Sequence, residues 1–525
     1  MNRNTLLNSI LVSLLAMALL MLAVSPSSDA ATVTIDPGTE HQTMEGWGAA
    51  AVHWENKFAG LPPAKRTEAF DLVFQDLGFN ILCVRLHSNF QMTDGGAYDW
   101  ADMADQRTIL SGALKEGRNT IDTVWVKVGS PPGWMKEGDT TIAWASYDGH
   151  IIPTPYYYQA YADYLAYYFK GMQNTYGFNL DAVSLFNEPG YGDTGITYDS
   201  TDTNPAQYKE ALAYVSATFA ADPALQHVRF MAPEANKITS SGTVKGCYTS
   251  TTDTTEGFVP VLLYDPVSRA QIDIVSTHQY GDTMFQYDPA NAPDNWTRLR
   301  DECATYGKPI WESEGFIGGA NQMASEDIAE GLRAARYMWV AVTQGNVTAW
   351  HYHQYCTPWD NAGLNKAPSI LSIDPDEQDF TVFPRYYVMK QWGRNVPKGS
   401  IRIDATSGNS DLRVTAWTKP DGDLAIIAFN ETDNPISATF NCSSIDGPIT
   451  HIRTSQGENY QQRPDITPTT GSFSTTIIGQ SISTFVAPVG PSAPLQLVPL
   501  VIWPVVPILL AAGIVALRRC LEPVE

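Results

Sequence analysis

The sequence predicts an α/β fold: a (β/α)8 TIM barrel with an appended antiparallel β-sandwich domain. Two observations carry this prediction. Between residues 41 and 384, eight short apolar segments alternate with helical segments, and each apolar segment ends in polar or aromatic residues. From about residue 401, short alternating strands separated by turn residues replace this pattern. Alternating β and α units in this number indicate a closed parallel barrel whose site lies at the carboxyl ends of its strands.

The eight apolar segments have the length and the β-branched content of buried strands. They are residues 45–50, 80–87, 123–129, 182–186, 228–231, 272–277, 309–314 and 346–352. Helical periodicity fills the intervals, most clearly at 65–77, 156–176, 205–221, 296–306 and 326–344. A doubly wound open sheet is the structural alternative, because periodicity does not reveal whether a sheet closes. No Gly-rich phosphate loop follows the first strand, which disfavours that alternative.

Residues 385–488 predict the β-sandwich. Short alternating strands recur there at 412–418, 424–430, 438–442, 449–454 and 481–488. Residues 31–40 alternate in the same way and have no place in the barrel, so we expect this N-terminal strand to join the sandwich. Residues 489–496 are a linker rich in Pro, Gly and Ser.

Both ends of the chain carry segments outside these domains. Residues 1–30 predict a signal peptide, with a basic start, the apolar stretch Leu6–Val24 and the small-residue cleavage site Ser28-Asp29-Ala30. An uncleaved anchor is the alternative. Residues 497–525 predict a hydrophobic C-terminal sorting or anchor tail, whose apolar part is long enough to cross a bilayer and is followed by Arg518-Arg519. We therefore expect an exported protein, extracellular or held at the cell surface through this tail.

Composition limits the partners. The 525 residues include 33 Lys and Arg against 56 Asp and Glu, a formal net charge of −23. This charge argues against a nucleic-acid or anionic-lipid partner and disfavours a strongly anionic polymer as substrate. The six cysteines lack metal-ligand spacing, and Cys83 lies in an apolar strand as a core thiol. The sequence predicts neither a metal nor a cofactor, and it does not indicate an oligomeric state.

The strongest candidate for a catalytic group is Glu188. It follows the buried strand in DAVSLFNEPGY (181–191), and Pro189 and Gly190 end that strand. Glu188 is therefore expected at the strand's carboxyl end. A carboxyl group beside the amide of Asn187 suits a general acid with a sugar-hydroxyl ligand next to it. Taken alone, an Asn-Glu-Pro turn with a solvated Glu explains the motif equally well.

A second carboxyl group is available on the seventh strand. Hydrolysis of a glycosidic bond with retention needs two carboxyl groups about 5 to 5.5 Å apart. The strand at 309–314 offers Glu312 and Glu314, which share one face because they are two residues apart. Glu314 is nearer the carboxyl end and precedes Gly315. It is the preferred nucleophile.

Seven motifs at strand ends, taken together, resemble glycoside hydrolase family 30, which belongs to a clan of retaining barrel hydrolases. They are GWG (46–48), VRLH (84–87), SPPGWMK (130–136), FNEPGY (186–191), STHQYG (276–281), WESEGF (311–316) and AWHYHQ (349–354). The resemblance extends over residues 32 to 488. The segments AVHWENK (51–57) and HYHQY (351–355) do not match a subfamily, so the resemblance leaves the substrate open.

The resemblance implies a role for each matching residue. Glu188 would be the acid/base and Glu314 the nucleophile, and Asn187 would bind the 2-hydroxyl of the reacting sugar. Further substrate-binding or supporting residues are implied at the same strand ends. Arg85 would keep Glu314 ionised by charge pairing, Tyr280 would donate a hydrogen bond to Glu314, His278 would line the same wall, and Trp134, Trp350 and Trp47 would form the sugar subsite.

These features predict a retaining O-glycosyl hydrolase that cleaves β-glycosidic bonds in a neutral polysaccharide or oligosaccharide, by endo or exo action. One alternative is a catalytically inactive surface protein that binds glycans or serves in adhesion on a barrel scaffold. A metal-dependent lyase or an aldolase-type barrel is a third class. It would need a metal triad or a Schiff-base lysine at a strand end, and the sequence offers neither.

Overall fold

The computed structural model describes residues 30–489, except 119, 143–148, 191–198, 241–244, 251–254, 281–292, 316–326, 359–368, 375 and 377. Residues 1–29 of the expected signal peptide, residues 490–496 of the linker and the C-terminal tail lie outside the described residues. Within the described part, no helix combines the length and the apolar composition needed to cross a bilayer.

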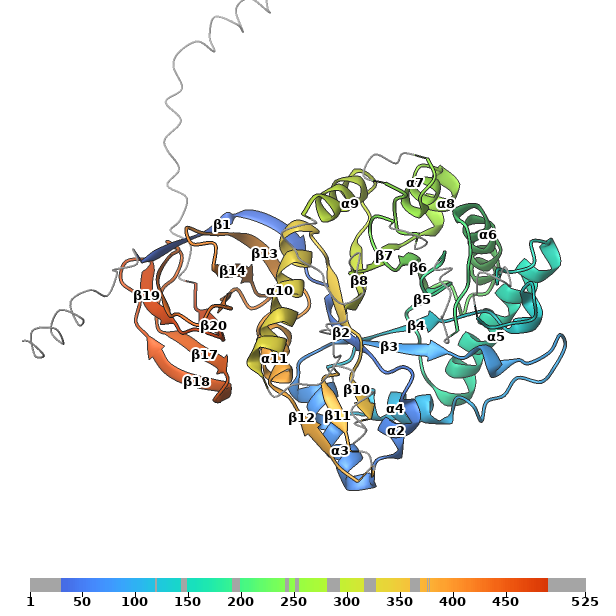
Figure 1. Ribbon diagram of the computed structural model, residues 1–525, viewed down its shortest axis with the longest axis horizontal. Helices are drawn as coiled ribbons and strands as arrows, with labels where there is room; N and C mark the ends of the chain where they lie inside the picture. The colour runs from blue at the N-terminus through green and yellow to red at the C-terminus, as the bar shows by residue number, and fades with distance from the viewer. Residues whose placement is uncertain are drawn as a thin grey trace, which may run out of the picture.

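Eight parallel strands close a barrel in chain order, so the (β/α)8 prediction is confirmed and the open sheet is wrong (Figure 1). The strands are β2 (Gly46–Ala50), β3 (Ile81–Leu86), β4 (Thr123–Val128), β5 (Ala182–Ser184), β6 (Arg229–Ala235), β7 (Ile274–His278), β8 (Ile310–Gly315) and β9 (Ala349–Tyr352). Closure is explicit in the pairing of the first strand with the last, where Trp47 lies opposite Trp350.

Helices surround the barrel (Figure 1). They are α2 (Glu55–Gly60), α3 (Pro63–Asp71) with the π-helical turn η1 (Leu72–Asp76), α4 (Ala104–Ala113), α5 (Pro155–Tyr176), α6 (Pro205–Ala221), α7 (Phe258–Leu263), α8 (Pro266–Gln271), α9 (Pro293–Thr305) and α10 (Ile328–Gln344). Two 3-10 turns, η2 (Ser88–Phe90) and η3 (Gly133–Met135), follow β3 and β4. A small sheet of β10 (Cys356–Pro358), β11 (Leu371–Ile373) and β12 (Phe380–Val382) follows β9.

The barrel interior is filled in layers. The layer farther from the carboxyl ends of the strands is apolar. It consists of Ala50, Val52, Ile81, Cys83, Trp125, Ala182, Met231, Ile274, Trp311 and Ala349. Side chains on one face of a strand recur at every second residue. Two residues further along, the same faces carry Arg85, Lys127 and His351. The imidazole of His351 packs on Trp125 and Trp311, with ring centroids 5.7 and 5.3 Å apart. The apolar layer therefore supports a polar layer nearer the carboxyl ends of the strands.

The second domain is a nine-stranded, mostly antiparallel sheet that wraps around its own core. Its hydrogen-bonded order is β18-β17-β20-β15-β14-β13-β1-β16-β19. The strands are β1 (Ala31–Thr43), β13 (Ile401–Ser407), β14 (Leu412–Thr418), β15 (Leu424–Asn430), β16 (Ile436–Asn441), β17 (Ile449–Ser455), β18 (Glu458–Ile466), β19 (Ser472–Ile477) and β20 (Ser481–Ala487). The rings of Phe440, Phe473 and Phe485 pack between opposite parts of the sheet, with centroids 4.7 to 5.3 Å apart.

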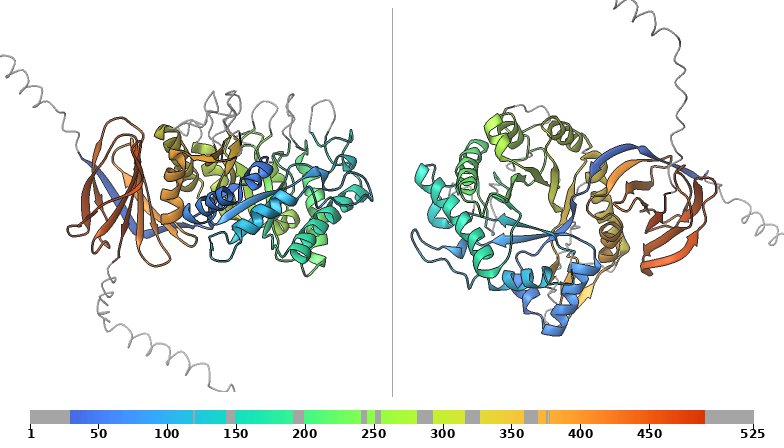
Figure 2. Two further views of the ribbon diagram at one scale, coloured as in Figure 1. Left: turned by 90° about the horizontal axis from the view of Figure 1, so that it is seen from below. Right: turned by 180° about the vertical axis from the view of Figure 1, so that it is seen from behind.

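The N-terminal strand β1 belongs to this second sheet, as Figure 2 shows. It pairs antiparallel with β13 and parallel with β16. Pro37 and Gly38 do not end this strand. Asp36 Oδ1 accepts a hydrogen bond from the Gly38 amide at 2.9 Å, and the register shifts there, so the turn residues form a bulge and pairing resumes at Glu40.

The junction between the domains begins later in the chain than the expected sandwich boundary. Residues 384–395 form the helix α11 (Pro384–Asn395), and the first sandwich strand after the barrel starts at Ile401. Helices α10 and α11 lie between the barrel and the second sheet (Figures 1 and 2). Gln391 on α11 donates to Thr454 Oγ1 at 2.8 Å and accepts from Thr484 Oγ1 at 2.7 Å. The helix therefore joins the two domains.

Trp47 lies at this junction, which contradicts its expected role in a sugar subsite. Its ring packs on Trp392 of α11 and Trp417 of β14, with centroids 5.4 and 6.4 Å apart. Its indole N–H donates to the carbonyl of Val396 at 2.8 Å. The side chain is fully buried, because on this strand it points outward between barrel and sandwich. Trp47 is a core residue of the junction.

The five cysteines among the described residues are all unpaired and buried: Cys83, Cys247, Cys303, Cys356 and Cys442. Cys83 lies in the apolar layer inside the barrel, as expected for a core thiol. The described part of the fold is therefore held together without disulfide bonds.

The position of Trp47 leads to a stability prediction. Trp47→Ala should lower the free energy of unfolding by about 3 to 5 kcal/mol, because it leaves a large cavity and an unpaired carbonyl at the junction. Urea unfolding followed by circular dichroism would measure this loss. Trp134→Ala is the matched control and should cost much less stability, since Trp134 is only partly buried. Equal losses for the two variants would contradict the assignment of Trp47 to the core.

Candidate active site

The backbone directs Glu188 toward the mouth of the barrel. The amide of Asn187 donates to the carbonyl of Val128 on β4 at 2.8 Å, and the amide of Glu188 donates to the carbonyl of Glu234 on β6 at 3.0 Å. Glu188 has a positive φ of 49°, and Gly190 has a φ of 78°. A non-glycine residue seldom adopts this conformation, so the flanking strands must hold it in place. The turn after β5 is therefore fixed on both sides.

Glu314 is directed inward by an irregularity in β8. Thr277 pairs with Glu312 and His278 pairs with Glu314, so Ser313 is an extra residue in β8 between these two pairs. Such a bulge changes the direction of the side chains that follow it. Gly315 comes next, and a Cβ there would lie 2.6 Å from the Trp350 ring, which only glycine avoids. The bulge and the glycine together place Glu314 at the end of the strand.

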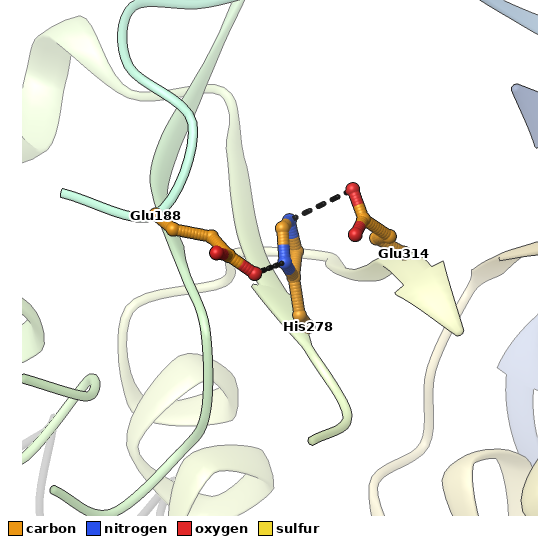
Figure 3. Close-up of side chains that lie close together, drawn as sticks. All are labelled: Glu188, His278 and Glu314. Carbon is orange, nitrogen blue, oxygen red and sulfur yellow. Dashed lines mark hydrogen bonds and ion pairs between the residues drawn. The ribbon is translucent and has the colours of Figure 1, made fainter. Parts of the chain in front are cut away.

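Glu188, His278 and Glu314 lie together at the carboxyl ends of β5, β7 and β8 (Figure 3). His278 Nδ1 is 2.8 Å from Glu188 Oε1, and His278 Nε2 is 3.9 Å from Glu314 Oε2. One carboxyl oxygen of each Glu and one nitrogen of His278 all lie within 4.8 Å of one another. Retaining glycosidases have carboxyl groups about 5 to 5.5 Å apart, whereas inverting enzymes separate them by about 6.5 to 9.5 Å. The geometry is that of retention.

Glu314 is ionised because it faces a buried ammonium group. Lys127 Nζ donates to Glu314 Oε2, and the Tyr280 hydroxyl donates to Glu314 Oε1 at 2.7 Å, as expected for Tyr280. Burial would raise the pKa of Glu314, but His353, whose Nδ1 lies 3.7 Å from Glu314 Oε2, together with the charges of Lys127 and His278, outweighs it and holds the pKa well below its ordinary value. The carboxylate is therefore an anion at neutral pH.

Glu312 differs from Glu314 in every respect that matters for attack on a substrate. It is fully buried, and burial raises its pKa well above the ordinary value. It is therefore a neutral carboxylic acid at neutral pH. The bulge at Ser313 puts Glu312 on the other face of β8 from Glu314, so the expectation that the two share one face is wrong. The preference for Glu314 as the nucleophile agrees with this placement, since a nucleophile must be ionised and reachable.

His278 lies between the carboxyl groups of Glu188 and Glu234. Its Nδ1 faces Glu188 at 2.8 Å and its Nε2 faces Glu234 Oε1 at 3.2 Å. An imidazolium donates from both ring nitrogens, so this form suits a ring that faces a carboxyl oxygen on each side. Burial lowers the pKa of His278, but the charge of Glu314 and the hydrogen bonds to Glu188 and Glu234 outweigh it and raise the pKa to about 10.

Arg85 does not pair with Glu314, so this expectation is wrong. Its guanidinium donates to Asp199 Oδ2 at 2.6 Å and lies 3.1 Å from His53 Nδ1. The residue beside Glu314 is Lys127, one strand further along. Arg85 lies on β3, and its charge is already paired by Asp199. It borders the mouth without touching the nucleophile.

Trp350 and Trp134 differ in exposure. Trp350 is fully buried, and its indole N–H donates to Gln279 Oε1 at 3.2 Å. It packs against the backbone of Gly315 and exposes no surface, so the expectation that it forms a sugar subsite is wrong. Trp134, in contrast, is only partly buried, and its indole N–H donates to the carbonyl of Gln91 at 3.1 Å. Its ring is available at the loop after β4.

Asn187 has an unused hydrogen-bonding atom. Its side-chain oxygen is buried and has no hydrogen-bond partner among the described residues. A buried carbonyl oxygen without a donor costs free energy unless a ligand satisfies it. Asn187 is thus placed to accept a hydrogen bond from a bound hydroxyl.

Sequence reasoning missed several residues that the fold brings to the site. Lys127, Glu234 and Asn236 face the catalytic pair, and the Asn236 amide donates to Glu188 Oε1 at 2.8 Å. The sequence did contain a signal for Lys127, which is the single charged residue of the strand TVWVKV and lies next to its carboxyl end. The segments that matched no subfamily meet here too, since the rings of His53 and His353 are 5.6 Å apart.

The close group of Glu188, His278 and Glu314 does not fit a metal ion. Both ring nitrogens of His278 already face carboxylate oxygens, at 2.8 and 3.2 Å. The Lys127 ammonium lies against Glu314, where a divalent ion would be repelled. The positive charge that a metal would supply is already present in the side chains.

Comparison with protein families identifies the chain. The model of O-glycosyl hydrolase family 30 matches residues 84–363, more than half of the chain, and the model of the family's β-sandwich domain matches residues 399–485. The chain belongs to glycoside hydrolase family 30. This family 30 protein is a retaining O-glycosyl hydrolase of β-glycosidic bonds, and nothing favours the inactive binding protein.

Relatives of this family 30 protein cover nearly its whole length. It is 24% identical to the glucuronoxylanase XynC of Bacillus subtilis (strain 168), over 91% of this chain and 98% of the relative. It is 23% identical to an endo-1,6-β-D-glucanase of Neurospora crassa, over 78% of this chain and 84% of the relative. A solved family 30 subfamily 8 xylanase, Xyn30A from Clostridium acetobutylicum, superimposes with a TM-score of 0.65 at 22% identity, over 88% of this chain and 100% of that chain.

Two buried histidines of the barrel, His278 and His351, should have pKa values on opposite sides of neutral pH. His278 should stay an imidazolium through neutral pH and lose its proton only near pH 10, whereas His351 should stay neutral, because burial lowers its pKa to about 4. Nitrogen-15 NMR of labelled histidine would measure both, with assignments from His278→Gln and His351→Gln. Since the pKa of His278 is raised, its contribution to stability is complete below its ordinary value of 6.5 and is lost as pH rises toward 10. A neutral His278 at pH 7 would contradict the charge arrangement.

Proposed function

We propose that Glu188 is the acid/base and Glu314 the nucleophile of this retaining hydrolase. The observation that carries the proposal is the pair of carboxyl groups within 4.8 Å at the barrel mouth, with the Lys127 ammonium against only Glu314. Because Glu314 has a cation beside it, Glu314 suits the role of the ionised nucleophile, and Glu188 suits the role of the proton donor. A nucleophile must be ionised while its neighbour carries the proton to be donated.

The reaction then proceeds in two displacements. Glu188 donates its proton to the glycosidic oxygen while a Glu314 oxygen attacks the anomeric carbon, so the leaving sugar departs as an alcohol and a glycosyl ester forms on Glu314. Glu188, now a carboxylate, takes a proton from water, and the water oxygen attacks the same carbon. The Glu314 carboxylate is released. Two inversions give net retention.

Other side chains around the pair would bind the reacting sugar. The unsatisfied oxygen of Asn187 would accept a hydrogen bond from the 2-hydroxyl, and such bonds strengthen as the transition state forms. Tyr280 would fix the attacking carboxylate through its hydrogen bond to Oε1. Trp134 would supply an aromatic face for a neighbouring sugar unit, because aromatic rings present apolar surface to sugar rings.

We propose a neutral, β-linked glycan as the substrate. One relative is named for a neutral glycan, as an endo-1,6-β-D-glucanase, whereas the glucuronoxylanase XynC is named for a glycan with acidic groups. The chain itself carries a net charge of −23, which opposes an anionic polymer. Near the mouth, the charge of Arg85 is already paired with Asp199. A neutral glycan is the class that this charge distribution favours.

The sequence supports an exported enzyme. The basic, apolar and small-residue regions of residues 1–30 follow the order of a signal peptide, and residues 497–525 follow that of a sorting or anchor tail. We propose that the mature chain begins at Ala31 and acts outside the cell or at its surface. Mass spectrometry of the exported protein would test this, and a mature chain that retains residues 1–30 would overturn it.

Glu188→Gln and Glu314→Gln should reduce the rate of hydrolysis in different ways. Loss of the proton donor should slow hydrolysis of native glycans by about 10²- to 10⁴-fold but slow activated aryl glycosides far less, because their leaving groups need little protonation. Glu314→Gln should abolish turnover of both substrate types, since no glycosyl ester can form. Steady-state kinetics on a glycan and on a 4-nitrophenyl β-glycoside would measure the difference.

Glu312→Gln is the matched control for the nucleophile. It changes a neutral, fully buried acid into a neutral amide of the same shape, so most activity should remain. If Glu312→Gln abolished turnover while Glu314→Gln retained it, the nucleophile would be Glu312. Equal losses on glycans and aryl glycosides in Glu188→Gln would remove the acid/base role.

A hydrolysis screen of the purified full chain would test the substrate class. The panel should contain β-1,4-xylan, β-1,6-glucan, β-1,6-galactan and cello-oligosaccharides, with glucuronoxylan as the anionic comparison. We expect release of sugars from at least one neutral glycan, with retention visible as the β-anomer in proton NMR. Activity confined to the anionic polymer would contradict the proposed class.

A further inference from the structure

Beneath the two catalytic carboxyl groups, charged side chains alternate in sign. Lys127 Nζ contacts Glu314 Oε2 and lies 3.9 Å from Glu234 Oε1. The same Glu234 oxygen lies 3.2 Å from His278 Nε2, and His278 Nδ1 reaches Glu188. Two cations therefore lie between three carboxyl groups. Lys127, Glu234 and His278 are almost completely enclosed, so water cannot screen these charges.

We propose that Lys127 and Glu234 form a charge-balancing pair that keeps the group of Lys127, Glu234, His278, Glu188 and Glu314 neutral in both halves of the reaction. The proposal rests on the assignment of Glu188 and Glu314 above. Lys127 and Glu234 would act through Glu314 and His278 and would be positioning residues, whereas Glu188 and Glu314 touch the substrate. Their function would be to decide which carboxyl group holds the single mobile proton.

The charges of the resting enzyme sum to zero in this arrangement. Lys127 and His278 carry one positive charge each, and Glu234 and Glu314 carry one negative charge each. Glu188 is the remaining carboxyl group, and it can be neutral only by holding a proton. The proposed acid role places the proton on Glu188, and the five groups then avoid the cost of a net charge in a buried site.

The sum remains zero after the first displacement. The bond between the anomeric carbon and the leaving oxygen breaks, the Glu188 proton goes to that oxygen, and the new ester removes the charge of Glu314. Glu188 is now the second carboxylate beside Glu234, opposite the same two cations. Water then supplies the proton that returns to Glu188, and the ester releases the Glu314 carboxylate. Neither half of the reaction leaves a net charge.

The other ionisable groups around Glu314 do not disturb this balance. They are Cys83 on β3, Tyr280 after β7, Glu312 on β8, His351 on β9, His353 after β9, and Arg85, which contacts both Asp199 and His53. Burial raises the pKa values of Cys83, Tyr280 and Glu312 well above their ordinary values and lowers those of His351 and His353 to about 4. These groups are neutral near pH 7, and Arg85 is paired with Asp199.

The pKa directions of the pair agree with its geometry. Burial would lower the pKa of Lys127, but the charges of Glu314 and Glu234 outweigh it and raise the pKa. Burial would raise the pKa of Glu234, but the hydrogen bond and charge of His278 and the charge of Lys127 lower it. Each partner thus stabilises the charged form of the other.

Three variants test the pair: Lys127→Met, Glu234→Gln and the double variant. Lys127→Met leaves an excess negative charge, Glu234→Gln leaves an excess positive charge, and the double variant is neutral again. Titration of carboxyl carbons by carbon-13 NMR, in the full chain labelled at glutamate Cδ, needs no substrate. Loss of one resonance in Glu314→Gln identifies Glu314. A failed substrate screen would therefore leave this test intact.

In Lys127→Met, the titration midpoint of Glu314 should rise by at least about one pH unit. In the double variant, it should return toward the wild-type value. The rate profile on a hydrolysed glycan, whose leaving group needs the proton of Glu188, supplies the second readout. Lys127→Met should move its acid limb to higher pH, Glu234→Gln should move its alkaline limb to lower pH, and the double variant should restore both limbs. A purely structural role would lower the rate without moving either limb.

The proposal would be overturned if the titration midpoint of Glu314 and the limbs of the rate profile did not move in the single variants. It would also be overturned if the double variant showed larger shifts than the single variants. A single variant that does not fold would be replaced by Lys127→Arg or Glu234→Asp, which keep the charge. These conservative variants should keep the wild-type limbs even if kcat falls. If both Lys127→Arg and Glu234→Asp displaced the limbs of the rate profile, the proposal would also be overturned.

Discussion

The ion pair of Lys127 and Glu314 is the interaction on which the rest of the active site depends. It lies inside a closed barrel, above a fully apolar layer that includes Trp125 and Trp311. A charge in that environment is costly unless it is paired and hydrogen-bonded. Once Glu314 is an anion there, a cation must lie next to it, and further charges must balance that cation. The polar layer of the barrel follows from this requirement.

The pair also explains why the backbone is irregular where it is. Glu188 can meet His278 only because the turn after β5 adopts a positive φ, and Glu314 can meet Lys127 only because β8 carries a bulge. Regular strands would direct these side chains elsewhere. The hydrogen bonds from Asn187 and Glu188 to the neighbouring strands hold the unusual turn in place. Irregular backbone and buried charge are thus two parts of one arrangement.

The second domain stabilises the barrel from outside. Trp47, Trp392 and Trp417 form one aromatic cluster between a barrel strand, the helix α11 and a sandwich strand. Trp339 of α10 also donates to the carbonyl of Val414 at 3.0 Å. These contacts fix the side of the barrel where β2 and β9 close the ring. β9 in turn pairs with β8, which carries Glu314, so the junction lies two strands away from that carboxyl group.

The sequence by itself determined the barrel, its eight strands and the strand in residues 31–40, and it placed Glu188, Glu314 and Tyr280 at or just after strand ends. These follow from local patterns: periodicity, turn residues and the position of a motif at a strand end. Only the tertiary structure decided that Lys127, not Arg85, pairs with Glu314, and that Trp47 and Trp350 are core residues. Arg85 and Lys127 lie on adjacent strands and both follow apolar runs, so the linear pattern does not distinguish them. Which cation meets which carboxylate, and whether an aromatic ring faces solvent or another ring, depends on strand register and on what packs across it, and that is a property of the folded chain.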